Sequence, residues 1–413
     1  MYIMNFFKIF SITFLALTAV ALTACNDDNG AKYKPRADIQ LTQEQKAIAE
    51  SGNEFAVNAF KAINSNDSNV LISPYGMQLT LAMMANGAKG ETLREITSAM
   101  HTGAATAADL NAYYKTLTKA LVDADDRVAV NFLSAFWYAK GLSANPDFTA
   151  ALSNAYGATS SSIDFSSPDA LGTINGWVSK ATGGKMSKLF SFLPPETQAC
   201  LASAMTFHGI WSQFMQEFTK PVADEFINYM NKKEQCKVFG ANDINTRIAN
   251  GKDADMLELD YGNGSFVMDL IVPKVGSKIN EYVSELSTQK INAFLTDLRS
   301  RAVFLQMPKF EADYNNDLEG TLKALGVKKI FNDGDLSGIA NTNMQITQYL
   351  QQMHINVNEK GTKITVSTGW SGGPTAMIGS CCFINSPFVY LIRERSTGVI
   401  LAIGKVQTMA GMQ

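Results

Sequence analysis

The residues of this chain whose types and spacing could take part in a reaction lie near the C-terminus, in residues 357–388. Gly361 precedes residues 362–368, in which apolar and small residues alternate with polar ones as in a strand with one buried face. Residues 369–377 follow, and their glycines and proline indicate an exposed loop. Such a segment could offer a peptide bond for cleavage at one end and pair as a strand at the other. The alternative is an ordinary hairpin with a long connection.

Other residue types that carry chemistry are scattered along the chain. The three histidines, His101, His208 and His354, lie in no recognisable catalytic motif, and the chain has no Cys-x-x-Cys pair. We therefore expect no enzymatic activity, no metal site and no cofactor. Apart from Cys25, the cysteines are expected to be free and mostly buried thiols: Cys200, Cys236, Cys381 and Cys382.

The N-terminus has the pattern of a targeting segment. Lys8 precedes the mostly apolar residues 9–22, a stretch too short to span a membrane comfortably. It ends in Leu22-Thr23-Ala24-Cys25, which resembles a bacterial lipobox, in which the cysteine is lipidated and becomes the new N-terminus. We expect a signal peptide in residues 1–24, a lipidated polar tether in 25–43 and one domain in 44–413. The alternative is an ordinary secretory signal with a chance cysteine.

The composition limits the class of protein. Hydrophobic residues make up 46% and charged residues 18% of the 413 residues, which is typical of a well-packed globular protein. The formal charge is only -3, and no run of lysines or arginines suggests a surface that binds phosphates. We therefore expect no nucleic-acid partner.

The coarse pattern of elements is helices first and strands later. Residues 44–63 show helical spacing, residues 69–72 form a short strand, and Ser73-Pro74 begin a second helix. Residues 128–138 and 199–211 are apolar runs that suit buried strands, and the C-terminal region is rich in strands. Helices followed by strands predict an α+β fold.

Several motifs then resemble those of the serpin family, and they cover about residues 45–408. They occur in family order: Asn69-Val70-Leu71-Ile72-Ser73-Pro74, Ile174-Asn175-Gly176-Trp177-Val178, Phe207-His208-Gly209-Ile210-Trp211, Met307-Pro308-Lys309-Phe310 and Asn385-Ser386-Pro387-Phe388. The resemblance implies one domain of three β-sheets with about nine helices. It also implies an exposed reactive loop that can insert into the main sheet.

The resemblance assigns roles to individual residues. The hinge of the loop would comprise Glu359, Lys360, Gly361, Thr362, Ile364 and Val366. The family's loop length, counted forward from Gly361, places the cleaved bond at Thr375-Ala376. Counted back from Ile384, it places the bond at Ala376-Met377, so both remain open. Lys309 and Trp211 would support the top of the sheet, Lys309 through a pair with Glu359.

The sequence departs from the family pattern in two places that matter for insertion. The hinge has Lys363-Ile364-Thr365-Val366 where small residues are usual. Gly76, Ser203 and Gln351 stand where serine, asparagine and histidine are common in the part of the sheet that must open.

The resemblance implies a monomeric protease inhibitor that traps its target after cleavage. Small uncharged residues at the cleaved bond favour an elastase-like or subtilisin-like serine protease, with a cysteine protease as another target. The alternative is a non-inhibitory serpin acting as a binding or chaperone-like surface protein. With a lipid on Cys25, we expect the protein in a bacterial cell envelope, anchored to a membrane and open to display on the outer surface.

Overall fold

The computed structural model describes residues 33–194, 196–212, 219–340, 342, 344, 346–363 and 380–412. Lys34 is the first residue of the compact unit that contains the whole fold. This described part has nine α-helices: α1 (Gln43–Ile63), α2 (Pro74–Ala85), α3 (Gly90–Ala99), α4 (Ala107–Val122), α5 (Pro146–Tyr156), α6 (Asp169–Ala181), α7 (Ile279–Ser284), α8 (Thr288–Asp297) and α9 (Glu319–Ala324).

The strands form two hydrogen-bonded sheets. Their bounds are β1 (Val70–Ile72), β2 (Val128–Ala139), β3 (Thr159–Ile163), β4 (Ala199–Ile210), β5 (Val222–Ile227), β6 (Lys233–Asn250), β7 (Ala254–Asp260), β8 (Phe266–Pro273), β9 (Arg299–Pro308), β10 (Phe310–Asp317), β11 (Leu350–Asn358), β12 (Gly361–Lys363), β13 (Ser380–Phe383), β14 (Phe388–Glu394) and β15 (Ile400–Val406). The six-stranded sheet has the order β10-β11-β12-β4-β2-β3, and the nine-stranded sheet has the order β1-β15-β14-β8-β7-β6-β9-β13 with β5 beside β6. The α+β class is confirmed. The strands expected in a second and a third sheet are joined into one, because the long β6 pairs with both β5 and β7.

Local sequence signals explain where the first helices begin. Thr42 caps α1 in a capping box with Gln45, and its side chain accepts a hydrogen bond from the Gln45 N–H. Ser73 caps α2, whose first residue is Pro74, a position where the missing N–H of proline is harmless. Nearly all of α2 is buried, so this helix forms the centre of the core and contacts both sheets.

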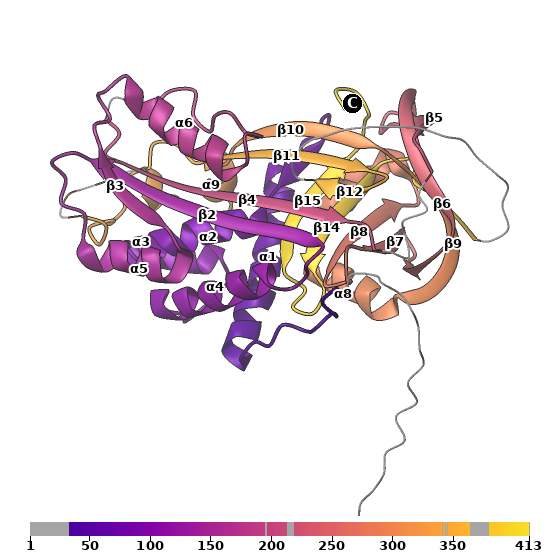
Figure 1. The fold of residues 1–413 in the computed structure, drawn as a ribbon, viewed down its shortest axis with the longest axis horizontal. Helices are drawn as coiled ribbons and strands as arrows, with labels where there is room; N and C mark the ends of the chain where they lie inside the picture. Colours follow the sequence, from indigo (N-terminus) through magenta and orange to yellow (C-terminus); the bar gives the residue numbers. More distant parts are fainter. Residues whose placement is uncertain are drawn as a thin grey trace, which may run out of the picture. The chain divides into compact units, whose positions relative to one another are not determined.

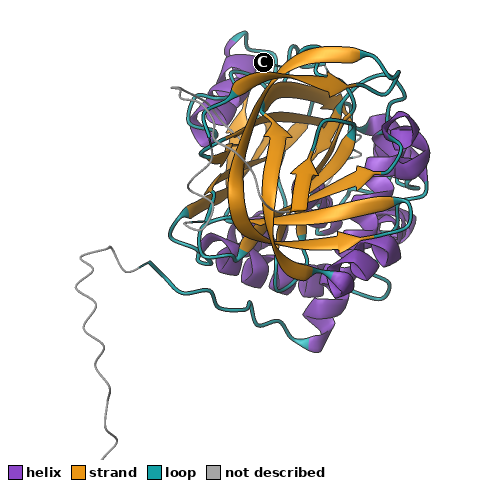
Figure 2. Cartoon of the chain, turned by 90° about the vertical axis from the view of Figure 1, so that its right-hand side faces the viewer, coloured by secondary structure: helices purple, strands orange, loops and turns teal. Residues whose placement is uncertain are grey.

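The two sheets pack against each other, and most helices lie to one side of them (Figure 2). In Figure 1, β2 and β4 run beside β11 and β10, with the short β12 at one end between β11 and β4. This arrangement places the first residues of the predicted hinge inside the six-stranded sheet.

The nine-stranded sheet contains a buried group of ions. Arg393 on β14 lies between Asp269 on β8 and Glu258 on β7, and the Arg393 Nε to Asp269 Oδ2 distance is 2.5 Å. All three side chains are almost completely buried. Burial, followed by repulsion from Asp269, raises the pKa of Glu258 to about 7. These ion pairs join three neighbouring strands of the sheet, β7, β8 and β14.

The segment before α1 lies against the body of the protein. The Lys34 N–H donates to Asp126 Oδ2 at 3.1 Å, and the Ile39 N–H donates to Ser396 Oγ at 2.9 Å. Ile39 and Leu41 also pack against the core. Among the described residues, no helix is both long and apolar enough to cross a membrane.

A buried lysine joins the last strand to two helices. Lys405 on β15 donates to Asn64 Oδ1 at 2.8 Å, after the end of α1, and to Asn280 Oδ1 at 2.6 Å, on α7. Burial lowers the pKa of Lys405 to about 8, and attraction from Asp67 offsets this shift only in part.

We predict a pH dependence of stability that comes from Lys405. Between pH 8 and pH 10.5, the unfolded chain keeps the Lys405 proton while the folded chain releases it, so stability rises with pH across this window. The Lys405→Met variant lacks this group. Denaturant unfolding from pH 7.5 to 9.5 should therefore show the free energy of unfolding of the wild type rising relative to that of the variant. A constant difference would contradict the assignment.

Candidate functional site: a seated hinge above an open slot

The predicted hinge begins as a three-residue strand in the middle of the six-stranded sheet. After β11 the chain turns at Glu359-Lys360 and returns as β12. β12 pairs with β11 on one side and with β4 on the other, so that Thr362 lies between Val357 and Gly209. Both edges of β12 are therefore satisfied by neighbouring strands.

Gly361 is required by a close backbone approach. Its φ is +147°, and a Cβ atom placed there would lie 2.1 Å from the Gly209 carbonyl oxygen. Only glycine fits such a position without moving the backbone of β4. The predicted pivot is thus also the residue that lets the hinge enter the sheet.

Thr362 is hydrogen-bonded to Tyr261, whose ring stacks on that of Trp211. The side chain of Thr362 is fully buried, and the Tyr261 hydroxyl donates a hydrogen bond to Thr362 Oγ1. Burial raises the pKa of Tyr261 well above its ordinary value, so its hydroxyl keeps its proton. The Tyr261 ring stacks on Trp211 with centroids 4.6 Å apart and an angle of 8° between the planes. The Trp211 indole N–H in turn donates to the Asn358 carbonyl oxygen at 2.8 Å.

The opposite face of β12 carries positive charge. Lys363 lies beside His208 of β4 in the register of the two strands. Burial, and then repulsion from Lys363, lowers the pKa of His208. His208 is therefore mainly neutral at neutral pH, so it does not place a second positive charge beside Lys363.

Below β12 the edges of β4 and β11 face each other across a slot. We use this name for the gap between residues 201–205 and 348–353; in the described part of the chain, no strand pairing joins β4 to β11 there. A cavity of about 80 Å³ lies between these two stretches. Its lining includes Ser73, which caps α2, and Thr80 within α2. It also includes Leu189 and Phe190, which follow α6. The sheet thus has an unfilled strand position directly in line with the hinge.

A side-chain amide fastens β11 to the first turn of α2. Gln351 Oε1 accepts from the Ser73 N–H at 2.8 Å, and Gln351 Nε2 donates to the Ser73 carbonyl oxygen at 3.0 Å. A Cβ atom on Gly76 would lie 3.4 Å from Gln351 Nε2 and 3.2 Å from Ser73 Oγ, so glycine leaves this contact uncrowded. Across the slot, Ser203 of β4 bonds Thr80 of α2 through their hydroxyl oxygens at 2.9 Å. The unusual residues therefore form a hydrogen-bonded network of their own.

The remaining predicted site residues are placed as follows. Lys309 lies between β9 and β10, and its N–H donates to the Lys237 carbonyl oxygen at 2.7 Å. Lys309 and Glu359 are both described, and the expected ion pair between them is not among the ion pairs of the described residues. The predicted site residues that lie outside the described residues are Cys25, Ile364, Val366, Thr375, Ala376 and Met377.

Two features were missed by sequence reasoning. Tyr261 belongs to no recognisable sequence motif, and it meets Thr362 only when the chain is folded. Residues 369–373 read Gly-Trp-Ser-Gly-Gly, which fits the Gly-x-Ser-x-Gly pattern of some hydrolases. This match lies outside the described residues.

These features define a protein whose six-stranded sheet holds the first residues of the predicted hinge as a short strand between β11 and β4. The family model described as "Serpin (serine protease inhibitor)" matches residues 50–409, and the chain belongs to this family. Iripin-8 of Ixodes ricinus is 29% identical over 90% of this chain and 96% of its own length. The leukocyte elastase inhibitor of Xenopus laevis is 28% identical over 85% of this chain and 96% of its own length.

Solved structures agree on the fold. The thermophilic serpin tengpin in its native state has a TM-score of 0.78 and 23% identity, over 92% of this chain and 97% of its own. A thyroxine-binding globulin in complex with thyroxine also has a TM-score of 0.78, with 21% identity over 87% of this chain and 99% of its own. At these identities, the similarity to both structures establishes the fold alone.

We predict that Tyr261→Phe loosens the hinge. The substitution removes the donor to a buried hydroxyl and should lower the free energy of unfolding by about 1 kcal/mol. Hydrogen exchange at the Thr362 and Lys363 amides should become faster than in the wild type. Tyr390→Phe is the matched control, because the Tyr390 hydroxyl is buried and has no hydrogen-bond partner among the residues that the structure describes. Equal exchange in both variants would contradict a role for Tyr261 at the hinge.

We also predict that Gln351→Met costs about 2–3 kcal/mol of stability. Methionine keeps the length of the side chain but leaves the buried Ser73 N–H without its partner. It also removes one of the two hydrogen bonds to the Ser73 carbonyl oxygen, which still accepts from the Met77 N–H. Gln352→Met is the control, since Gln352 makes no side-chain hydrogen bond among the described residues and lies on the other face of β11. Thermal and denaturant unfolding would measure both, and equal losses would refute a specific contact between Gln351 and Ser73.

Proposed function

We propose that this chain inhibits a protease by acting as a suicide substrate. The protease cleaves the loop near Thr375 or Ala376, and the freed loop then fills the slot as a strand. The single observation that carries this proposal is β12, three residues of the hinge already paired on both edges above an unfilled strand position.

The register of β12 supports insertion of the residues that follow it. If the same pairing continued down the slot, Ile364 would come between Ile355 and Phe207, and Val366 between Met353 and Met205. These are apolar positions, and burial of Ile364 and Val366 would contribute about 1.5–3 kcal/mol each. Insertion of about fourteen residues at about 3.3 Å per residue would carry an attached protease roughly 45 Å along the sheet. Such a displacement would distort the acyl-enzyme and stall its hydrolysis.

The proposed target is an elastase-like or subtilisin-like serine protease. Thr375 and Ala376 are small and uncharged, so neither suits a pocket built for lysine or arginine. One relative is named a leukocyte elastase inhibitor, which is in line with such a target for this chain. A cysteine protease is the other class that an acyl-enzyme trap would stall.

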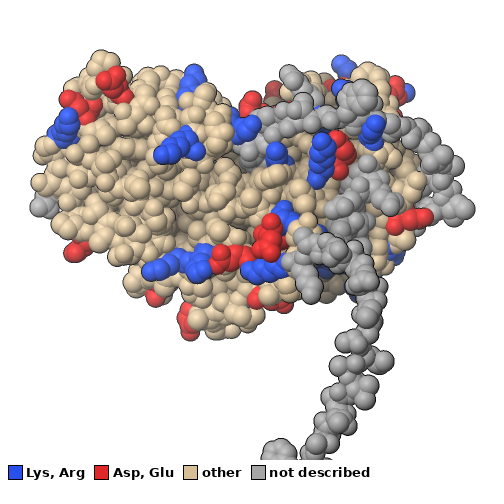
Figure 3. All heavy atoms as spheres, in the orientation of Figure 1, with Lys and Arg blue, Asp and Glu red and all other residues tan. Residues whose placement is uncertain are grey.

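We further propose that the protein acts as a monomer held at a bacterial membrane by lipid on Cys25. The lipobox-like residues before Cys25 support the lipid anchor. On the face shown in Figure 3, positive and negative side chains are interspersed and no large patch of one sign is formed. This surface gives no electrostatic reason for binding nucleic acid.

Incubation with pancreatic elastase and with subtilisin tests the function. On a denaturing gel, we expect a band at the summed mass of protein and protease, and a released fragment that begins within residues 376–377. Thr362→Arg should abolish the band and leave only cleavage, because a charge would enter a fully buried position. Lys363→Arg, on the outward face, should keep the band.

Clean cleavage of the wild type with no complex and no gain in melting temperature would refute the inhibitor proposal. It would leave the non-inhibitory binding protein as the function of the same fold. Mass spectrometry of the mature N-terminus would separately test the lipid on Cys25.

A further inference from the structure

The residues before α1 follow a fixed course along the body of the protein, and we call residues 34–41 the docked segment. Both backbone groups of Lys34 are bonded. Its N–H donates to Asp126 Oδ2 at 3.1 Å, and its carbonyl oxygen accepts from Asn263 Nδ2 at 3.1 Å. Farther along, the Ile39 N–H is bonded to the turn between β14 and β15. The chain is therefore held to the body from Lys34 onward and not only from the start of α1.

The point at which Lys34 joins the body lies beside the hinge. Asn263 belongs to the turn between β7 and β8, and in the same turn the Gly262 N–H donates to the Ile210 carbonyl oxygen at 2.9 Å. Ile210 is the strand partner of Gly361, the first residue of β12. One turn and one strand therefore separate Lys34 from the hinge, which puts them on the order of 20 Å apart at about 4.8 Å per strand spacing.

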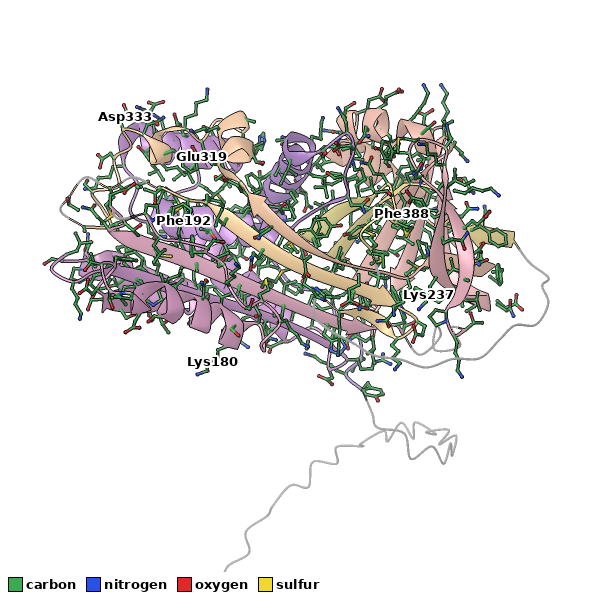
Figure 4. The ribbon with its side chains drawn as sticks, turned by 90° about the horizontal axis from the view of Figure 1, so that it is seen from above. Lys180, Phe192, Lys237, Glu319, Asp333 and Phe388 are labelled. Carbon is green, nitrogen blue, oxygen red and sulfur yellow. The ribbon has the colours of Figure 1, made fainter. Side chains whose placement is uncertain are left out.

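The hinge and Lys34 share one end of the six-stranded sheet. Lys237 marks this end, because its carbonyl oxygen accepts from the N–H of Lys309, and the next residue begins β10 level with β12. In Figure 4, Lys237 lies at one end of the molecule, and Phe192 and Asp333 lie at the other. The docked segment thus joins the body at the end from which the loop leaves the sheet.

The chain between Cys25 and the docked segment is short. Lys34 comes nine residues after Cys25, and nine residues span at most about 30 Å when fully extended. Without docking, the first fixed residue would be Thr42, the cap of α1, seventeen residues after Cys25 and up to about 60 Å away. Docking therefore halves the reach from Cys25 and moves the point of attachment to the hinge.

We infer that the reactive loop is presented to a protease that is held on the same membrane as this protein. This presentation rests on the proposed lipid on Cys25 and on the proposed cleavage of the loop, and it names the class of target. A lipid within about 30 Å of Lys34 keeps the base of the loop within roughly 50 Å of the bilayer.

The height of the loop matches the size of a protease domain. A domain of about 230 residues is roughly 45 Å across, so a protease anchored to the same bilayer has its active site at the height of the loop. Two partners confined to one thin layer meet at a raised effective concentration. A soluble protease gains no such advantage from the anchor.

The test uses the full lipidated chain in vesicles. The probe is pancreatic elastase with a polyhistidine tag, either held on the same vesicles by a nickel-chelating lipid or free in solution. The rate of loop cleavage is measured in both cases, because cleavage reports contact with the loop whether or not the protease is then trapped. The ratio of the rate with held elastase to the rate with free elastase measures the presentation.

Two variants change the reach and leave the loop untouched. The lengthened variant carries an insert of about twenty glycine and serine residues after Gly30. The undocked variant combines Asp126→Ala with Ser396→Ala, which removes the acceptors of the Lys34 and Ile39 N–H groups. Faster hydrogen exchange at these two amides shows that the segment has left the body.

Asp123→Ala is the matched control for the undocked variant. It removes a neighbouring carboxylate that bonds Lys119 at 2.5 Å and accepts no hydrogen bond from the docked segment among the described residues. Its exchange at the Lys34 and Ile39 amides should equal that of the wild type.

With the wild type, held elastase should cleave the loop at least about tenfold faster than free elastase at the same overall concentration. Effective concentration falls with roughly the 3/2 power of chain length. The ratio should therefore drop about two- to threefold in the undocked variant and about sixfold in the lengthened variant. The control should keep the wild-type ratio, and free elastase should cleave all four proteins at the same rate.

Three outcomes would overturn the inference. A wild-type ratio near one would show that the loop is not presented to a partner on the membrane. A ratio that changes in neither variant would show that the docked segment does not set the reach. A mature N-terminus without lipid would remove the anchor itself.

Failure of the proposed inhibition is a separate result. If held elastase cleaves the loop faster but no complex survives on a denaturing gel, the presentation stands and the inhibitor proposal fails. If the undocked variant does not fold, the lengthened variant still tests the reach, because it changes none of the described residues.

Discussion

The structure depends on two strand edges that are held apart. Below Lys363, no strand formed by the described residues lies between the edges of β4 and β11, although both strands lie inside a sheet and not at its border. Unpaired backbone groups at such an edge cost free energy unless water or another strand satisfies them. A strand that filled the slot would satisfy both edges along its length. Under the proposed function, insertion of the loop would therefore give a more completely hydrogen-bonded arrangement of the same residues.

Different parts of the fold act on this gap from different sides. The nine-stranded sheet, joined by the buried ions around Arg393, forms the base. α2 and its cap Ser73 pack on that base and reach both edges of the slot. Two hydrogen bonds join Ser73 to Gln351 on β11, and Ser203 on β4 bonds the Thr80 hydroxyl and the Gly76 carbonyl oxygen. Opening of the slot would therefore have to preserve or break contacts of α2 on both sides.

The sequence predicted those parts of the site that depend on local pattern. The glycine that begins β12 and the cap of α2 by Ser73 follow from backbone rules that apply over a few residues. The alternation predicted from Thr362 onward lies mostly outside the described residues and stays a prediction. The contacts of Tyr261 and Asn175 could not be predicted in this way. Tyr261 meets a residue 101 positions away, and the hydrogen bonds of Asn175 link α6 to the irregular segment around Phe190. The expected Lys309–Glu359 pair was carried over from the family, and aromatic stacking at Trp211 holds the turn in the described structure.

The stack of Trp211 on Tyr261 has a spectroscopic consequence. Trp211 is buried, bonded through its indole N–H to the turn before the hinge, and parallel to a ring that itself bonds the hinge. Withdrawal of β12 would change the polarity around this indole and expose its N–H to water. The emission of Trp211, one of the four tryptophans of the chain, is therefore expected to change when the hinge leaves the sheet.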